Sequence, residues 1–156
     1  MRHTISLAVE NKFGVLARIS GLFSARGYNI ASLAVSETLD PTISYMTIVV
    51  EAKDEKILEQ IKKQLNKLID VITVTDFTKK EHVERELILV KIKYGAKDTS
   101  KLETVLKKYV AKIIQHKGDT VIIEAVGEQQ QIKQLLEVLG HFGVKELVRT
   151  GRIAMA

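Results

Sequence analysis

The chain has 156 residues, one proline, no cysteine and a formal net charge of +5. Hydrophobic residues make up 46% of it without a long apolar run, which excludes a transmembrane helix and describes one medium or two small globular domains. The absence of cysteine excludes disulfides, thiolate metal sites and cysteine nucleophiles. The sequence Met1-Arg2-His3-Thr4 lacks the apolar core of a signal peptide, so we expect a cytoplasmic protein.

Hydrophobic periodicity in the first half predicts the element order βαββαβ. Ile5, Leu7 and Val9 alternate with polar or small residues, as in a strand with one buried face. Apolar residues then recur at three- and four-residue steps, as in an amphipathic helix. The predicted elements are a strand at 3–10, a helix at 14–26, strands at 28–38 and 43–51, a helix at 53–68 and a strand at 70–77.

The same order of elements returns after a polar, aperiodic segment at 78–84, which we interpret as a linker. The predicted elements are a strand at 85–94, a helix opening near Asp98, a hairpin of 112–116 and 120–126, a helix at 128–141 and a strand at 144–148. The fold class is therefore α+β, with two tandem ferredoxin-like βαββαβ units at 1–77 and 85–156.

Each unit has only about 75 residues and buries about 60–65% of its unfolded surface, so it is marginally stable on its own. Helices cover one face of such a sheet, while strands such as Leu87-Ile88-Leu89-Val90 are apolar on both faces. We therefore expect a second copy of the chain to supply the missing cover, and predict a homodimer.

The sequence predicts no catalytic and no metal-binding residues. It contains no G-x-S-x-G, H-E-x-x-H, P-loop or G-x-G-x-x-G pattern, and its four histidines are far apart. The excess positive charge lies in the second half, where we favour a solvated Lys/Glu surface over nucleic-acid binding. RNA-binding domains share this topology, but the aromatic content here is only 5% and their strand motif is absent. We expect neither a nucleic-acid nor a membrane partner.

The turn between the first strand and the first helix is the strongest candidate for a ligand site. A helix N-terminus presents backbone N–H groups and a positive dipole end, which favour a carboxylate. Side-chain amides would complement both charges of a free amino acid. The candidate residues are Asn11, Gly14, Val15, Leu16, Asn29 and Ile30.

The two asparagines lie at opposite ends of the predicted helix, about 20 Å apart at ~1.5 Å per residue. One ligand reaches both only if Asn11 and Asn29 come from different subunits. In the alternative interpretation these residues have only structural roles and bind no ligand. Asn11 then caps the helix, Gly14 allows the tight turn, and Asn29 ends the turn that follows the helix. Side-chain chemistry alone favours that alternative, because caps and turns are the common use of these residues.

The sequence of this segment resembles that of a known family. Asn11-Lys12-Phe13-Gly14-Val15-Leu16-Ala17-Arg18-Ile19, continuing to Gly27-Tyr28-Asn29-Ile30, closely resembles the N-terminal ACT domain of the small regulatory subunit of acetolactate synthase (acetohydroxyacid synthase). Asp40-Pro41-Thr42-Ile43-Ser44 and Val83-Glu84-Arg85-Glu86-Leu87 continue the resemblance, which covers most of residues 1–93. From residue 94 onward it is mainly one of length and element order.

The resemblance implies a regulatory rather than a catalytic function. Two such chains dimerise through their ACT domains and bind a branched-chain amino acid, usually valine, with contacts at Asn11, Gly14 and its neighbours, and Asn29 of the facing subunit. The small subunit needs no cofactor. It activates a catalytic subunit that carries thiamine diphosphate, Mg²⁺ and FAD, and valine reduces that activation.

Two positions depart from the family pattern: Ala17, where serine is frequent, and Ala31, where glutamate is frequent. One alternative is a stand-alone tandem amino-acid sensor without an enzyme partner. An enzyme of the acylphosphatase type is disfavoured, because the chain has no glycine-rich phosphate loop bearing an arginine.

Overall fold

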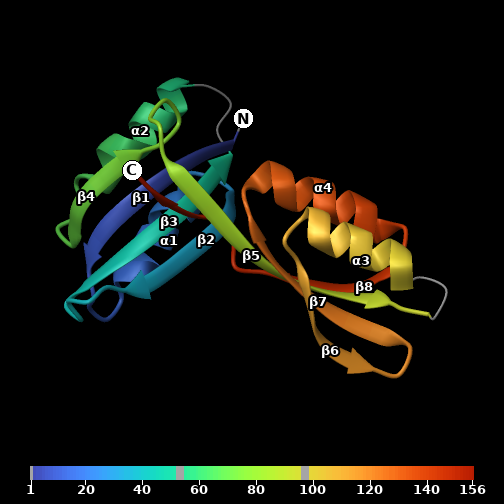
Figure 1. The fold of residues 1–156 in the computed structure, drawn as a ribbon. Coiled ribbons are helices and arrows are strands. Elements are labelled where there is room, and N and C mark those ends of the chain that lie inside the picture. The colour runs from blue at the N-terminus through green and yellow to red at the C-terminus, as the bar shows by residue number, and fades with distance from the viewer. Residues whose placement is uncertain (1, 52–54, 96–98) are drawn as a thin grey trace. The chain divides into compact units, whose positions relative to one another are not determined.

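The computed structural model describes residues 2–51, 55–95 and 99–156, and its chain divides into two compact units. The first contains the residues up to Val83 together with Arg152–Ala156, and the second is Glu84–Gly151. Figure 1 shows helices on one side of a sheet in each unit. The predicted α+β fold of two βαββαβ units is confirmed.

The first unit is a four-stranded antiparallel sheet in the order β2-β3-β1-β4. Its elements are β1 (Arg2–Glu10), α1 (Val15–Ser24), β2 (Ile30–Glu37), β3 (Ile43–Glu51), α2 (Glu55–Leu65) and β4 (Val71–Asp76). Residues 53 and 54 of the predicted second helix lie outside the described residues.

The core of the first unit lies between the sheet and its two helices. The alternating residues of β1 and the apolar stripe of α1 are almost completely buried there, as their periods require: Ile5, Leu7, Val9, Val15, Ile19 and Phe23. The helix α1 ends two residues earlier than predicted. Gly27, at φ 68°, reverses the chain, and the Tyr28 N–H donates to the Phe23 carbonyl at 3.0 Å.

The second unit repeats this arrangement, with sheet order β6-β7-β5-β8. Its elements are β5 (Val83–Lys93), α3 (Thr99–Lys108), β6 (Lys112–Lys117), β7 (Thr120–Gly127), α4 (Gln129–Gly140) and β8 (Val144–Arg149). Asp98, where the sequence predicts the helix to open, lies outside the described residues. The carboxylate of Glu86 is buried and accepts two hydrogen bonds of 2.7 Å from Arg149, which clamps β5 to β8.

The end of the chain returns to the first unit, although the sequence analysis assigned it to the second. The short strand β9 (Ile153–Met155) lies on the sheet face that the helices leave open. Ser32 and Thr47 accept backbone hydrogen bonds from Arg152 and Ala154, and the Arg152 guanidinium donates to Thr4, each at 3.3 Å. The chain's own tail thus covers part of that face, for which the sequence analysis expected a second copy.

No helix in the described part of the chain is long and apolar enough to span a membrane.

Candidate functional site

The turn between β1 and α1 presents the uncapped start of a helix. Gly14 occupies the N-cap position at φ 81°, a left-handed conformation that glycine adopts without strain. The first turn of α1, which the structure describes completely, contains no acidic residue and receives no side-chain cap. The positive end of the helix dipole therefore meets no negative side chain of its own helix, and the turn favours an external carboxylate.

Asn11 braces this turn and does not cap the helix. Its Nδ2 donates to the Pro41 carbonyl at 2.9 Å, and its backbone N–H donates to the Thr42 carbonyl at 2.7 Å. The hypothesis that Asn11 is the helix cap is wrong, because Gly14 takes that position. Asn11 joins the turn to the β2–β3 hairpin, and its side-chain carbonyl oxygen can still accept from a ligand ammonium.

Arg18 is a candidate that the sequence analysis did not single out. A Cβ placed on Gly14 would come within 3.2 Å of the Arg18 Nη1, so the guanidinium lies directly beside the glycine. Asp70, which is 7% exposed, holds this guanidinium by accepting from Nε and Nη2, each at 2.8 Å. The signal was present in the sequence, because a residue four positions after Gly14 lies on the same side of the helix.

The other candidates of the turn contribute unequally. Val15 is 3% exposed and its side chain packs into the core, while its N–H donates to the Lys12 carbonyl at 3.3 Å. Leu16 is 42% exposed beside it and can contact an aliphatic ligand. Ile30, the first residue of β2, packs against the core and is only partly buried.

Asn29 lies beyond the other end of α1. Its Nδ2 is 3.5 Å from the Glu51 carboxylate, and its carbonyl accepts from the Glu51 N–H at 3.2 Å. The ten residues of α1 separate it from Gly14 by about 15 Å at ~1.5 Å per residue. Within one chain, the structure brings Asn11, Gly14 and Arg18 together and leaves Asn29 and Ile30 apart from them.

Lys12 adds little net charge to the turn. Its ammonium lies 2.7 Å from the Glu10 carboxylate, and this hydrogen bond and the charge of Glu10 raise the pKa of Lys12 above its ordinary value. A second cation beside Gly14 is the Arg18 guanidinium, which pairs with Asp70 through Nε and Nη2 and leaves Nη1, the atom nearest Gly14, to donate to a ligand carboxylate.

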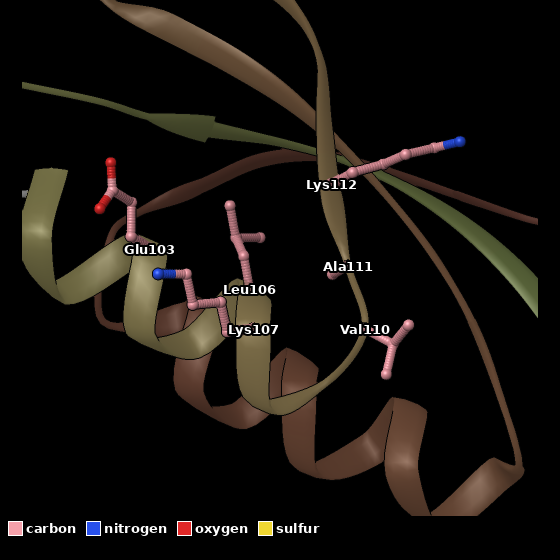
Figure 2. A pocket seen from close by; sticks show the side chains of 6 residues that line it. All are labelled: Glu103, Leu106, Lys107, Val110, Ala111 and Lys112. Carbon is pink, nitrogen blue, oxygen red and sulfur yellow. The ribbon is translucent and has the colours of Figure 1, made fainter.

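The second unit holds a pocket of about 660 Å³ between the end of α3 and the start of β6. Figure 2 shows its lining, which is formed by Glu103, Leu106, Lys107, Val110, Ala111 and Lys112. It combines aliphatic groups with two lysines and one glutamate. Across the described parts of the chain, no group of three or more His, Asp or Glu residues is placed to hold a metal ion.

The fold and the turn define a protein with an N-terminal ACT domain, and comparison with known proteins agrees. The family described as "AHAS small subunit-like ACT domain" matches residues 5–73, and the family described as "Small subunit of acetolactate synthase" matches residues 85–156. The chain belongs to the acetolactate synthase small-subunit family.

Full-length relatives support this assignment. The acetolactate synthase small subunit of Bacillus subtilis is 39% identical over 156 residues, covering 100% of this chain and 91% of that protein. The probable acetolactate synthase small subunit of Archaeoglobus fulgidus is 43% identical over 155 residues, covering 99% and 96%. The crystal structure of the Thermotoga maritima small subunit superposes with a TM-score of 0.88 at 34% identity, covering 99% and 96%.

Proposed function

We propose that this chain is the non-catalytic subunit that activates the catalytic subunit of acetolactate synthase and makes it sensitive to valine. In this proposal the first unit, to which residues 152–156 return, is the amino-acid-binding and dimerising domain, and Glu84–Gly151 is the C-terminal domain. Of the predicted linker 78–84, Val83 and Glu84 belong to strand β5. Thiamine diphosphate, Mg²⁺ and FAD belong to the catalytic subunit in this proposal.

The observation that carries the proposal is the positive, uncapped turn at Gly14. The helix start and the Arg18 guanidinium both favour a carboxylate at the same position. The amino acid's ammonium would meet the side-chain oxygens of Asn11 and of Asn29 from a second copy. Its aliphatic side chain would lie against Leu16 and Ile30.

The second copy is expected at strand β2. This strand is at the edge of the first sheet, so one row of its backbone N–H and C=O groups is not used in pairing with β3. Pairing of two such edges places the β2 strands of both copies side by side. Asn29, which directly precedes β2, is then carried toward the neighbouring chain.

In this proposal, regulation depends on a difference in affinity for valine between two arrangements of the dimer. Valine held between two copies stabilises one arrangement of the dimer, and it changes the catalytic subunit only if the two arrangements differ in affinity for valine.

The test is acetolactate formation by the catalytic subunit of the same organism, with this chain added and valine then titrated. We expect this chain to activate the enzyme and valine to reverse the activation. Activation without a valine response would refute the proposed amino-acid site. Direct valine binding without activation would favour a stand-alone amino-acid sensor.

A further inference from the structure

The last five residues of the chain lie as a strap on the open face of the first sheet. Arg152–Ala156 belongs to the first unit, and a hydroxyl group on each of three neighbouring strands accepts a hydrogen bond from it. The acceptors are Ser32 on β2, Thr47 on β3 and Thr4 on β1, each at 3.3 Å. We call Arg152–Ala156 the tail strap.

The contacts of the tail strap with the first sheet are weak. At 3.3 Å, these three hydrogen bonds are longer than the ~2.7–3.2 Å that is typical of N–H donors and oxygen acceptors in proteins. The hydroxyl acceptors bind water equally well once the strap leaves. Ile153 and Met155, the larger apolar side chains of the strap, remain exposed. The strap can therefore detach from this sheet while the core on the other face stays intact.

Strand β2 carries a bulge directly before its contact with the tail strap. The register of β2 against β3 shifts between Ile30 and Ser32, so Ala31 is an extra residue. Ile30 and Leu33 both pack against the core, although a regular strand places residues three apart on opposite faces. The bulge makes this possible, and it turns the Ser32 hydroxyl toward the face on which the strap lies.

We propose that the bulge at Ala31 couples an amino acid bound at Asn29 and Ile30 to the docking of the tail strap. The inference rests on the proposed function, in which these two residues contact the ligand. They directly precede the bulge, and on its other side Ser32 accepts the hydrogen bond from the Arg152 N–H. A ligand that fixes Asn29 and Ile30 also fixes the bulge and the direction of Ser32, so it stabilises the docked strap.

This coupling extends the effect of the ligand beyond its own site. Gly151, at φ 78°, is the last residue of the second unit, and the tail strap follows it directly. A change in strap docking therefore changes how the end of the second unit is tethered. By linkage, docking of the strap raises the affinity for the ligand by the same factor by which the ligand stabilises docking.

Amide hydrogen exchange at Arg152 and Ala154 measures docking, because these N–H groups donate to the sheet when the strap is docked. The test compares their exchange rates by NMR in the full-length protein, without valine and with saturating valine. We expect valine to slow both rates by at least about fivefold, the lower end of typical coupling between two sites. Unchanged or faster exchange in protein saturated with valine would overturn the inference and leave the proposed function standing.

A double variant, Ser32→Ala with Thr47→Val, removes both acceptors of the strap backbone and changes side-chain size little. Exchange at the two amides should then be fast with and without valine, and valine binding, measured by calorimetry, should weaken. The matched control is Ser36→Ala, which removes an exposed hydroxyl from the same face of β2 and should keep the valine effect on exchange.

The outcomes separate the coupling from the proposed function. If the double variant binds valine as tightly as the wild type, docking of the strap and binding of the ligand are independent, and only the coupling is refuted. If the wild-type protein binds no valine, the proposed function and the coupling are both refuted. The exchange rates of the wild type decide the question even if the double variant does not fold.

Discussion

Two features meet at Gly14: a backbone torsion that favours glycine and the positive charge of the neighbouring Arg18. The φ of 81° favours glycine, and the space where a Cβ would stand is 3.2 Å from the Arg18 Nη1. A negatively charged group at this point interacts favourably with the guanidinium and with the positive end of the helix dipole at the same time. The proposed site therefore favours the carboxylate of an amino acid as well as its aliphatic part.

The variant Gly14→Asp should therefore lose the valine response, because its carboxylate occupies the place of the ligand's carboxylate beside Arg18. Gly14→Asn is the matched control, since asparagine has nearly the same size, tolerates the left-handed conformation and carries no charge. We expect valine to bind at least about tenfold more tightly to the Asn variant than to the Asp variant, as measured by calorimetry. Equal affinities would show that bulk or strain, and not charge, decides the effect.

The sequence predicted part of this site and missed another part for a physical reason. Gly14 stands at the junction of a period-two and a 3.6-period pattern, so its place at a helix start was predictable from the chain alone. The Arg18–Asp70 pair joins residues 52 positions apart and depends on the register between β1 and β4. Periodicity does not specify that register, so Asp70 could not be assigned as the partner of Arg18.

Among the elements, the β2–β3 hairpin forms one wall of the turn through Asn11. Asp40 organises this hairpin by accepting from the Thr42 hydroxyl at 2.6 Å and from the Thr42 N–H at 2.9 Å. These hydrogen bonds, that from the hydroxyl first, lower the pKa of Asp40 below its ordinary value of 3.8. A lowered folded-state pKa means that the contribution to stability is fully present above pH 3.8 and is lost as the pH falls through the lower value.

Thr42→Val should thus raise the pKa of Asp40 toward 3.8, which a carboxyl NMR titration measures. The variant should be less stable than the wild type at neutral pH, and the difference should shrink in acid, where Asp40 is protonated in both proteins. The control Thr104→Val removes a hydroxyl that donates to the Ser100 carbonyl in α3 and has no role in the hairpin. An Asp40 pKa that is the same in wild type and Thr42→Val would contradict this account of the hairpin.

Element order was predictable throughout, because both units carry strong period-two and 3.6-residue patterns. The end of α1 and the start of β2 were each predicted two residues too far, because Gly27 turns the chain between Ser24 and Ile30. Strand β9 was missed because three residues are too short to show a period. Its place on the first sheet depends on the hydroxyl groups of Ser32 and Thr47, which accept hydrogen bonds from its backbone.

At the scale of the whole molecule, the two halves of the proposed site lie at opposite ends of α1. Gly14 and Arg18 stand at its start, and Asn29 follows its end. A single chain therefore offers one ligand only half of the contacts. In the proposed dimer, two copies related by a two-fold axis would form two complete sites, each with Gly14 from one chain and Asn29 from the other.

The most direct measurement mixes two defective proteins, Gly14→Asp and Asn29→Ala, by refolding them together and titrating valine by calorimetry. Each variant alone should bind no valine, because both of its sites lack one essential residue. In the mixed dimer, one site carries both defects and the other carries none, so random pairing should restore about a quarter of the wild-type binding sites. If mixing restores no binding although dimers form, the amino acid is not held between two copies by Gly14 and Asn29, and the account is wrong.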